Sequence, residues 1–160
     1  MSKKIPVRPN PIQGSLSYCL VFRSGQIEAV FIGSRDNKQS GDKPFIPSRA
    51  YEEETIKAVQ NYLGALKSLE IPCPLAIFIS LTGVLGVTLS IDSFMYRSIP
   101  NPIDRDTLIL PDVIVQDYTL ASEFNLLARI LRPTFDSVWN ACGYQNSMNF
   151  NTNGDWNQKG

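Results

Sequence analysis

The spacing of apolar residues restricts the fold of this chain more than any other feature of its sequence. Two segments, near residues 48–71 and 121–144, repeat apolar residues every three or four positions, as one face of an α-helix requires. Runs typical of strands cover residues 15–23, 26–35, 75–81, 87–91 and 107–118. The order β-β-α-β-β-β-α predicts an α+β protein. We expect a mostly antiparallel five-stranded sheet covered by two main helices, in a profilin-like or longin-like element order.

The first helical segment begins with a polar residue and three consecutive acidic ones. Ser48 is a suitable N-cap, and Glu52, Glu53 and Glu54 follow it near the positive end of the helix dipole. A metal or acid–base cluster is the alternative interpretation of the three glutamates. The apolar stripe after them is made of Ile56, Val59, Leu63 and Leu66.

The middle of the chain predicts the centre of the sheet. Residues 75–81 form a continuous apolar run, which is typical of a strand buried on both faces. Residues 87–91 alternate in polarity and are expected to pair back with that strand as a hairpin. Pro111 interrupts the run 107–118, so this strand is expected to bend there or to lie at an edge.

The second helical segment and the residues after it complete the predicted domain. Its apolar stripe includes Phe135, Val138, Trp139 and Cys142, and Gly143 is placed to end the helix. We expect an extended lead-in over residues 1–14, one domain over 15–144, and an Asn-rich tail over 145–160 that packs on the domain.

Composition excludes several classes of activity. The chain has no histidine, which removes the commonest general base and every Ser-His or Cys-His nucleophile pair. Cys19, Cys73 and Cys142 lie far apart in the sequence and form no closely spaced pair of the kind that binds zinc. We expect them to be free thiols in a reducing compartment. Basic and acidic residues balance at 15 each, which argues against strong non-specific binding to nucleic acid.

No apolar run approaches the roughly 20 residues that a membrane span needs. The sequence therefore predicts a soluble cytoplasmic protein with no membrane association and no cofactor.

One group of acidic residues is a weak candidate for a metal site. Asp104 and Asp106 would share a face if they lay on a strand, and Asp112 is a further carboxylate nearby. The alternative is a solvated loop in which Arg105 screens both charges. Residues 82–86 (TGVLG) lack the lysine of a phosphate-binding loop, so we predict no nucleotide site there.

A second group of residues is a candidate interaction surface. Aromatic side chains and arginine are favoured in protein contacts, and aromatic rings also stack on bases. The candidate interaction residues are Arg23, Arg35, Tyr144, Phe150 and Trp156. Docking of the tail onto the domain explains the three aromatic residues equally well.

Four blocks of the sequence resemble the C-terminal region of bacterial proteins with an N-terminal Schlafen/Alba-like domain, described as DNA-binding or ATP-binding. These blocks are residues 20–30 (LVFRSGQIEAV), 74–86 (PLAIFISLTGVLG), 103–117 (IDRDTLILPDVIVQD) and 131–156. In such proteins the nucleic-acid or nucleotide activity is attributed to the N-terminal domain, for which nothing before residue 20 is long enough. The resemblance implies that this chain is the accessory half, and it supplies no catalytic residues.

Three functional hypotheses follow. The leading one is a non-catalytic interaction module that contacts a protein partner or a second copy of itself. The first alternative is a nucleic-acid-binding module, suggested by the resemblance and by the basic residues Lys3, Lys4, Arg8, Arg23 and Arg35. The second alternative is a metal-dependent nuclease or hydrolase that uses Asp104, Asp106 and Asp112.

Overall fold

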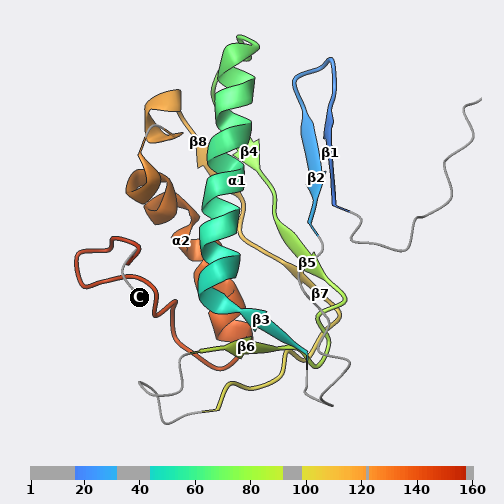
Figure 1. Ribbon diagram of the computed structural model, residues 1–160, viewed down its shortest axis with the longest axis vertical. Helices are drawn as coiled ribbons and strands as arrows, with labels where there is room; N and C mark the ends of the chain where they lie inside the picture. The colour runs from blue at the N-terminus through green and yellow to red at the C-terminus, as the bar shows by residue number, and fades with distance from the viewer. Residues whose placement is uncertain (1–16, 32–43, 92–98, 122, 158–160) are drawn as a thin grey trace, which may run out of the picture.

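The computed structural model describes residues 17–31, 44–91, 99–121 and 123–157 (Figure 1). Two main helices, one short 3-10 helix and several short strands lie in these ranges, which confirms the α+β class. The prediction of a five-stranded sheet is wrong, because the described strands pair as four two-stranded sheets. Most of these strands are three residues long, and each described strand pairs with only one other described strand.

The predicted N-terminal hairpin is confirmed. β1 (Tyr18–Val21) pairs antiparallel with β2 (Ile27–Val30), with Tyr18 opposite Val30 and Val21 opposite Ile27. Gly25, at φ +83°, takes the left-handed position that a short hairpin loop needs. The hairpin stands beside α1, with β1 as its outer strand (Figure 1).

A long two-stranded ribbon replaces the expected sheet centre. β4 (Leu75–Ile77) pairs antiparallel with β8 (Val113–Val115), and β5 (Ser80–Thr82) pairs antiparallel with β7 (Thr107–Ile109). Two residues separate β4 from β5, whereas three residues, 110–112, separate β7 from β8. The ribbon therefore contains a one-residue bulge at Pro111. Proline has no amide hydrogen, and in the bulge this costs no hydrogen bond between the strands.

The strand over residues 88–90 does not pair as expected. β6 (Thr88–Ser90) pairs in parallel with β3 (Phe45–Pro47), not with the run 75–81. β3 is not predicted from the sequence, because its three residues end a polar, Pro-containing segment. Parallel pairing brings residues far apart in sequence together, which local periodicity does not reveal.

The first helix, α1 (Ser48–Ser68), has the predicted extent and buries the predicted stripe. Ser48 is not its side-chain cap. The N-cap is Pro47, and the Ser48 hydroxyl donates instead to the backbone oxygen of Ser90 at 2.9 Å. This bond ties the start of the helix to the end of β6.

The predicted helical segment 121–144 corresponds to α2 (Phe124–Ala141). A short 3-10 helix, η1 (Tyr118–Ala121), precedes it at the end of the predicted strand 107–118. Pro133 lies inside α2 without ending it. Gly143 follows the helix at φ +87°, with its amide donating to Asn140 and the Tyr144 amide donating to Trp139. These two bonds form a Schellman motif, so the predicted stop at Gly143 is confirmed.

The core consists of two neighbouring clusters of buried apolar residues. One joins α1, α2, η1 and the β4–β8 pair, and the other joins β6, β7 and the end of α2. Tyr51 and Ile79 contact both clusters. In the part of the chain that the structure describes, no helix is long and apolar enough to span a membrane.

Candidate functional site

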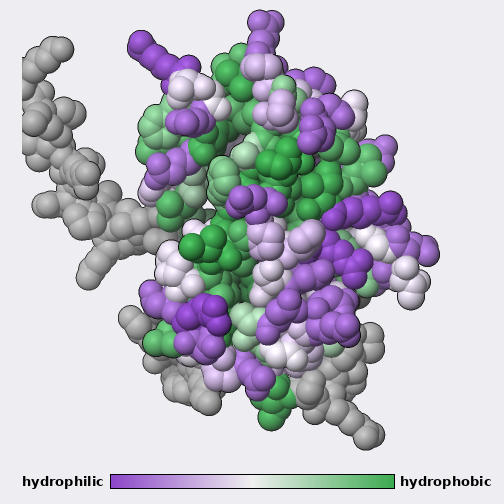
Figure 2. Space-filling view, turned by 180° about the vertical axis from the view of Figure 1, so that it is seen from behind, coloured by the Kyte–Doolittle hydropathy of each residue, from purple (hydrophilic) through white to green (hydrophobic). Residues whose placement is uncertain are grey.

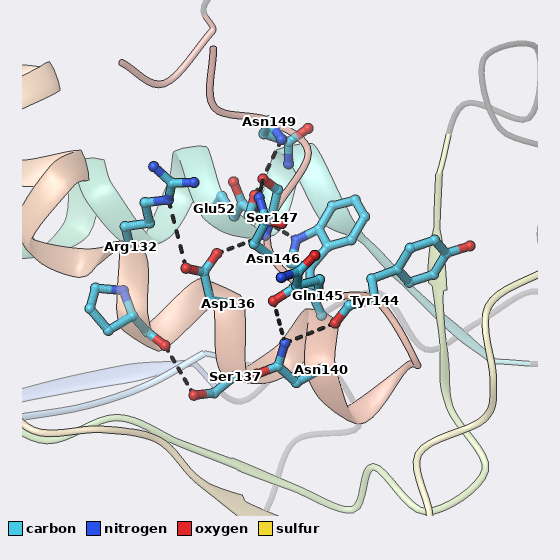
Figure 3. A network of polar contacts seen from close by, with 12 residues as sticks. Glu52, Arg132, Asp136, Ser137, Asn140, Tyr144, Gln145, Asn146, Ser147 and Asn149 are labelled. Carbon is cyan, nitrogen blue, oxygen red and sulfur yellow. Dashed lines mark hydrogen bonds and ion pairs between the residues drawn. The ribbon is translucent and has the colours of Figure 1, made fainter. Parts of the chain in front are cut away.

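A buried carboxylate lies at the centre of a polar network that joins both helices to the C-terminal segment (Figure 3). Glu52 of α1 is 0% exposed. Its Oε1 accepts hydrogen bonds from Trp139 Nε1 at 2.8 Å and from Ser147 Oγ at 2.7 Å. Its Oε2 accepts a bond from Trp156 Nε1 at 2.8 Å. The chain has two tryptophans, and both donate to this one side chain.

The electrostatics of Glu52 reflect two opposing effects. Burial raises the pKa of Glu52 above its ordinary value, because the charged form loses its water. Hydrogen bonds from Ser147 and the tryptophans act against that rise. The Asn149 amide acts in the same direction, although its Nδ2 makes no hydrogen bond of normal geometry among the described residues. Burial and the charge of Glu52 also raise the pKa of the neighbouring Tyr51 hydroxyl.

Further polar contacts fix the turn between α2 and the C-terminal segment (Figure 3). The Ser147 amide donates to Asp136 Oδ1 at 2.7 Å, and Arg132 Nε lies 3.6 Å from Asp136 Oδ2. The Asn140 amide donates to the backbone oxygens of Tyr144 and Gln145 at 2.8 and 2.7 Å. These bonds hold Ser147 where its hydroxyl reaches Glu52.

The end of the segment is fastened to the helices by a second set of contacts. Phe150 and Trp156 form an isolated antiparallel bridge around a tight turn. Arg129 pairs with Asp155 at 2.7 Å, and the Arg49 guanidinium lies 4.9 Å from the centre of the Trp156 ring. The C-terminal segment is therefore an integral part of the described fold.

This arrangement restricts the role of Glu52. A carboxylate with no exposed surface and three hydrogen-bond donors cannot reach a dissolved substrate in this conformation. The geometry instead makes Glu52 the acceptor that holds three segments together. The interpretation of Glu52, Glu53 and Glu54 as a helix-dipole group is wrong for Glu52, because its side chain turns into the core. Glu53 pairs with Lys57, and Glu54 is exposed.

The ribbon has an apolar face that nothing in the described structure covers. We call it the open face and define it as Ala76, Phe78, Ile109 and Ile114, all of which are exposed. Phe78 is 74% exposed, Ile109 84% and Ile114 48%. The alternate residues Leu75, Ile77, Val113 and Val115 point the other way and pack against the helices. Figure 2 shows hydrophobic residues gathered in patches on the surface seen from behind.

The expectation that residues 75–81 are buried on both faces is therefore wrong for this structure. The helices α1 and α2 cover one face of the ribbon only. An antiparallel ribbon with one solvated face normally carries polar residues there. This ribbon carries the apolar open face there, next to the exposed polar residues Ser80, Thr82 and Thr107.

The N-terminal hairpin is also apolar and exposed. Tyr18, Leu20, Phe22 and Val30 lie on one of its faces, and all four are exposed. The other face turns toward α1, where Cys19 interacts with Tyr62. Glu28 on the first face accepts a bond from the Tyr18 hydroxyl at 2.6 Å.

The candidate interaction residues do not form one patch. Tyr144 and Trp156 are buried, and the half-buried Phe150 stacks beneath Arg132. Their side chains dock the C-terminal segment because Trp139 and Glu52 lie directly behind them. Arg23 is exposed in the hairpin loop. Arg35 lies outside the described residues, as do Lys3, Lys4 and Arg8.

The acidic candidates for a metal site lie in exposed positions. Asp104 and Asp106 are in the loop before β7, not on a strand, and Asp112 lies in the bulge. Arg105 Nε bonds Asp104 at 2.8 Å, and this hydrogen bond lowers the pKa of Asp104. No three His, Cys, Asp or Glu side chains in the described ranges are grouped so that they could hold a metal ion.

The loop over residues 82–86 uses its amides within the fold. The amide of Val84 donates to Asp106, that of Gly86 to Ile103, and that of Val87 to Val84. These donors connect the loop to the strand entry at residues 103–106 and are not turned toward a phosphate.

Two features of the site are not among the predictions from the sequence, although each has a signal there. Glu52 lies four residues before Ile56, so it continues the buried stripe of α1. The open face includes Ala76 and Phe78 of the continuous apolar run 75–81, and that run is its signal in the sequence. Comparison with known proteins adds no identification: no family model, curated protein or solved structure matches the chain.

Proposed function

We propose that this protein is a non-catalytic interaction module that binds a protein partner through the open face of its ribbon. The partner contributes an apolar, weakly charged surface of a folded domain. The resemblance to the accessory half of bacterial Schlafen/Alba-like proteins is part of this proposal, as is a cytoplasmic location.

One observation carries the proposal: the four apolar side chains of the open face are exposed, whereas the opposite face of the ribbon is covered by the helices. Residues 75–81 form a continuous apolar run, which is typical of a strand buried on both sides. Exposed apolar side chains are normal when scattered singly, whereas neighbouring ones mark interaction sites. Ala76 lies opposite Ile114, and Phe78 and Ile109 flank the bulge between the two strand pairs.

The exposed area suits a binding centre. Complete burial of a phenylalanine or isoleucine side chain contributes about 1.5–3 kcal/mol. The exposed fractions of Phe78, Ile109 and Ile114 together correspond to about two such side chains, or roughly 3–6 kcal/mol. A micromolar complex needs about 8 kcal/mol, so a rim of further contacts would complete the affinity.

The two alternatives draw less support from the described residues. Four of the described arginines are engaged within the fold: Arg49 with Trp156, Arg105 with Asp104, Arg129 with Asp155, and Arg132 with Asp136. A nucleic-acid surface needs basic side chains that are free to meet phosphates. A metal-dependent hydrolase would need Asp104, Asp106 and Asp112 to converge. Asp104 and Asp106 are exposed in the loop before β7, Asp112 is exposed in the bulge, and the described residues contain no group of three that could hold a metal ion.

Site-specific photo-cross-linking tests the proposal. A photoreactive phenylalanine analogue is placed at position 109 or 78 of the full chain, in cells that naturally produce the protein. Position 61 on α1 is the matched control, because Asn61 is exposed on the side of the helix away from the core. We expect the same discrete protein adduct from positions 109 and 78 and none from position 61.

The captured protein is then purified and mixed with the purified chain. Direct binding that disappears with Ile109→Lys supports the proposal. Adducts of equal yield from all three positions, or an adduct to nucleic acid, would overturn it.

A further inference from the structure

The outer edge of β1 is not paired with any of the described strands. β1 pairs with β2 on one side, and no described strand pairs with its other side. In Figure 1, β1 is the strand of the hairpin that lies farther from α1 and the ribbon, so its free edge faces away from the body. Such an edge is a ready template for a further strand.

The hydrogen-bond pattern of the hairpin shows which groups this edge offers. The Phe22 amide donates to the Gln26 oxygen at 2.9 Å, so Phe22 belongs to a hydrogen-bonded pair. Pairs alternate along an antiparallel ladder, so Leu20 and Tyr18 also turn their amide and carbonyl groups toward β2. Cys19 and Val21 turn theirs outward, to the free edge.

The side chains of this edge do not discourage pairing. Natural edge strands commonly carry a charged residue, a proline or a bulge that blocks a second strand. β1 reads Tyr-Cys-Leu-Val and has none of these. A copy of β1 would therefore meet no like charge across this edge. β2, in contrast, carries the charged residue Glu28.

We infer that a second copy of this chain pairs antiparallel with the free edge of β1, in a register centred on Leu20. A two-fold axis at Leu20 places Cys19 of each copy opposite Val21 of the other. Both residues turn their backbone groups outward, so the pairing forms four backbone hydrogen bonds. The two hairpins then make one four-stranded sheet.

This register also matches the side chains. Tyr18 of each copy lies opposite Phe22 of the other, and Leu20 lies opposite its own counterpart. Cross-strand aromatic pairs and apolar pairs stabilise antiparallel sheets. An isolated two-stranded hairpin is marginal in water, so the second copy also supplies the support that this exposed hairpin lacks. The inference is independent of the partner proposed for the open face.

Disulfide trapping tests the register. In a Cys19→Ser background, Leu20→Cys places two thiols opposite each other on the axis. There the Cα atoms of a pair without hydrogen bonds lie about 4.5 Å apart, within disulfide range. Tyr18→Cys in the same background is the control. Position 18 lies on the same strand and the same face as position 20. In the proposed register, however, position 18 of one copy lies four residues from position 18 of the other, or roughly 14 Å along the strand.

We expect Leu20→Cys to oxidise to a covalent dimer at least about tenfold faster than Tyr18→Cys under mild oxidation. Equal rates, or a faster reaction at position 18, would overturn the register. Cys73 and Cys142 are kept in both variants, so their background reaction is common to both.

Sedimentation equilibrium of the unmodified chain tests the association itself. Val21→Pro removes an outward amide and should weaken dimerisation about tenfold or more, since two of the four backbone bonds are lost. Ile27→Pro is the control: it removes an outward amide on the opposite edge of the hairpin and should leave the dimer intact. A wild-type chain that stays monomeric into the millimolar range would overturn the inference, as would equal losses in the two proline variants.

Discussion

Glu52→Gln is the most informative test of the polar network. Glutamine has nearly the same shape as glutamate but one acceptor oxygen where the carboxylate has two. If the amide oxygen takes the place of Oε1, Trp139 and Ser147 keep their acceptor. The amide nitrogen then faces the Trp156 indole N–H, which is left without an acceptor in a buried position.

The expected cost depends on pH. An unsatisfied buried donor costs about 1–3 kcal/mol. The same destabilisation is expected at low pH, where Glu52 is neutral, because its hydroxyl oxygen still has a lone pair for Trp156 Nε1 and the amide nitrogen of glutamine has none. Because burial raises the pKa of Glu52 in the folded state, the folded protein binds its proton more tightly than the unfolded chain does. This tighter proton binding stabilises the folded wild-type protein. The stabilisation is complete below the pKa of Glu52 in the unfolded chain, near 4.5, and is lost as pH rises through its pKa in the folded protein. Glutamine does not titrate, so the difference in free energy of unfolding between wild type and Glu52→Gln becomes smaller as pH rises.

Urea denaturation followed by tryptophan fluorescence measures this gap directly. Both tryptophans donate to Glu52, so the signal comes from the network itself. Glu54→Gln is the control, because Glu54 is exposed, and it should change the free energy of unfolding by less than about 0.5 kcal/mol. A gap that widens with rising pH, or no gap at any pH, would refute the reasoning.

Three further substitutions test the helix ends and interior by the same assay. Gly64→Ala should stabilise the fold by about 0.5–1 kcal/mol, because a β-carbon there meets nothing within 4 Å; a destabilised variant would contradict this. Gly143→Ala should destabilise it by about 1–3 kcal/mol, since φ is +87° and the new carbon would lie 2.5 Å from Asn101 Nδ2; unchanged stability would contradict the Schellman geometry. Glu70→Gly should stabilise it by roughly 0.5–1 kcal/mol, because Glu70 holds φ +57° at the end of α1; a loss of stability would mean that its side chain matters more than its backbone.

Local patterns in the sequence predicted the elements that depend on local physics. The hairpin at β1 and β2, the buried stripe of α1, and the stop of α2 at Gly143 all follow from spacing or from glycine conformation. The aromatic residues of the C-terminal segment predict that it packs on the domain, and Trp156 is buried in the structure.

Long-range pairing could not be read in the same way. The parallel match of β3 with β6 joins short segments more than 40 residues apart, and neither has a distinctive composition. Pro111 alone predicts a bend or an edge in the strand. The bulge is defined by the pairing with the other strand, in which two residues lie opposite three. The role of Glu52 depends on donors 87 to 104 residues away, so its place on the apolar stripe was the single local signal.

The most direct test of the central claim is a binding measurement on the open face. Isothermal titration calorimetry compares the wild-type chain with Ile109→Lys, using the partner captured by cross-linking and Asn61→Lys as the charge-matched control. Ile109 is 84% exposed, so the lysine should leave the free energy of unfolding within about 0.5 kcal/mol of wild type. We predict at least a tenfold loss of affinity for Ile109→Lys and none for Asn61→Lys. Equal affinity for all three proteins would contradict the assignment of the open face as the binding surface.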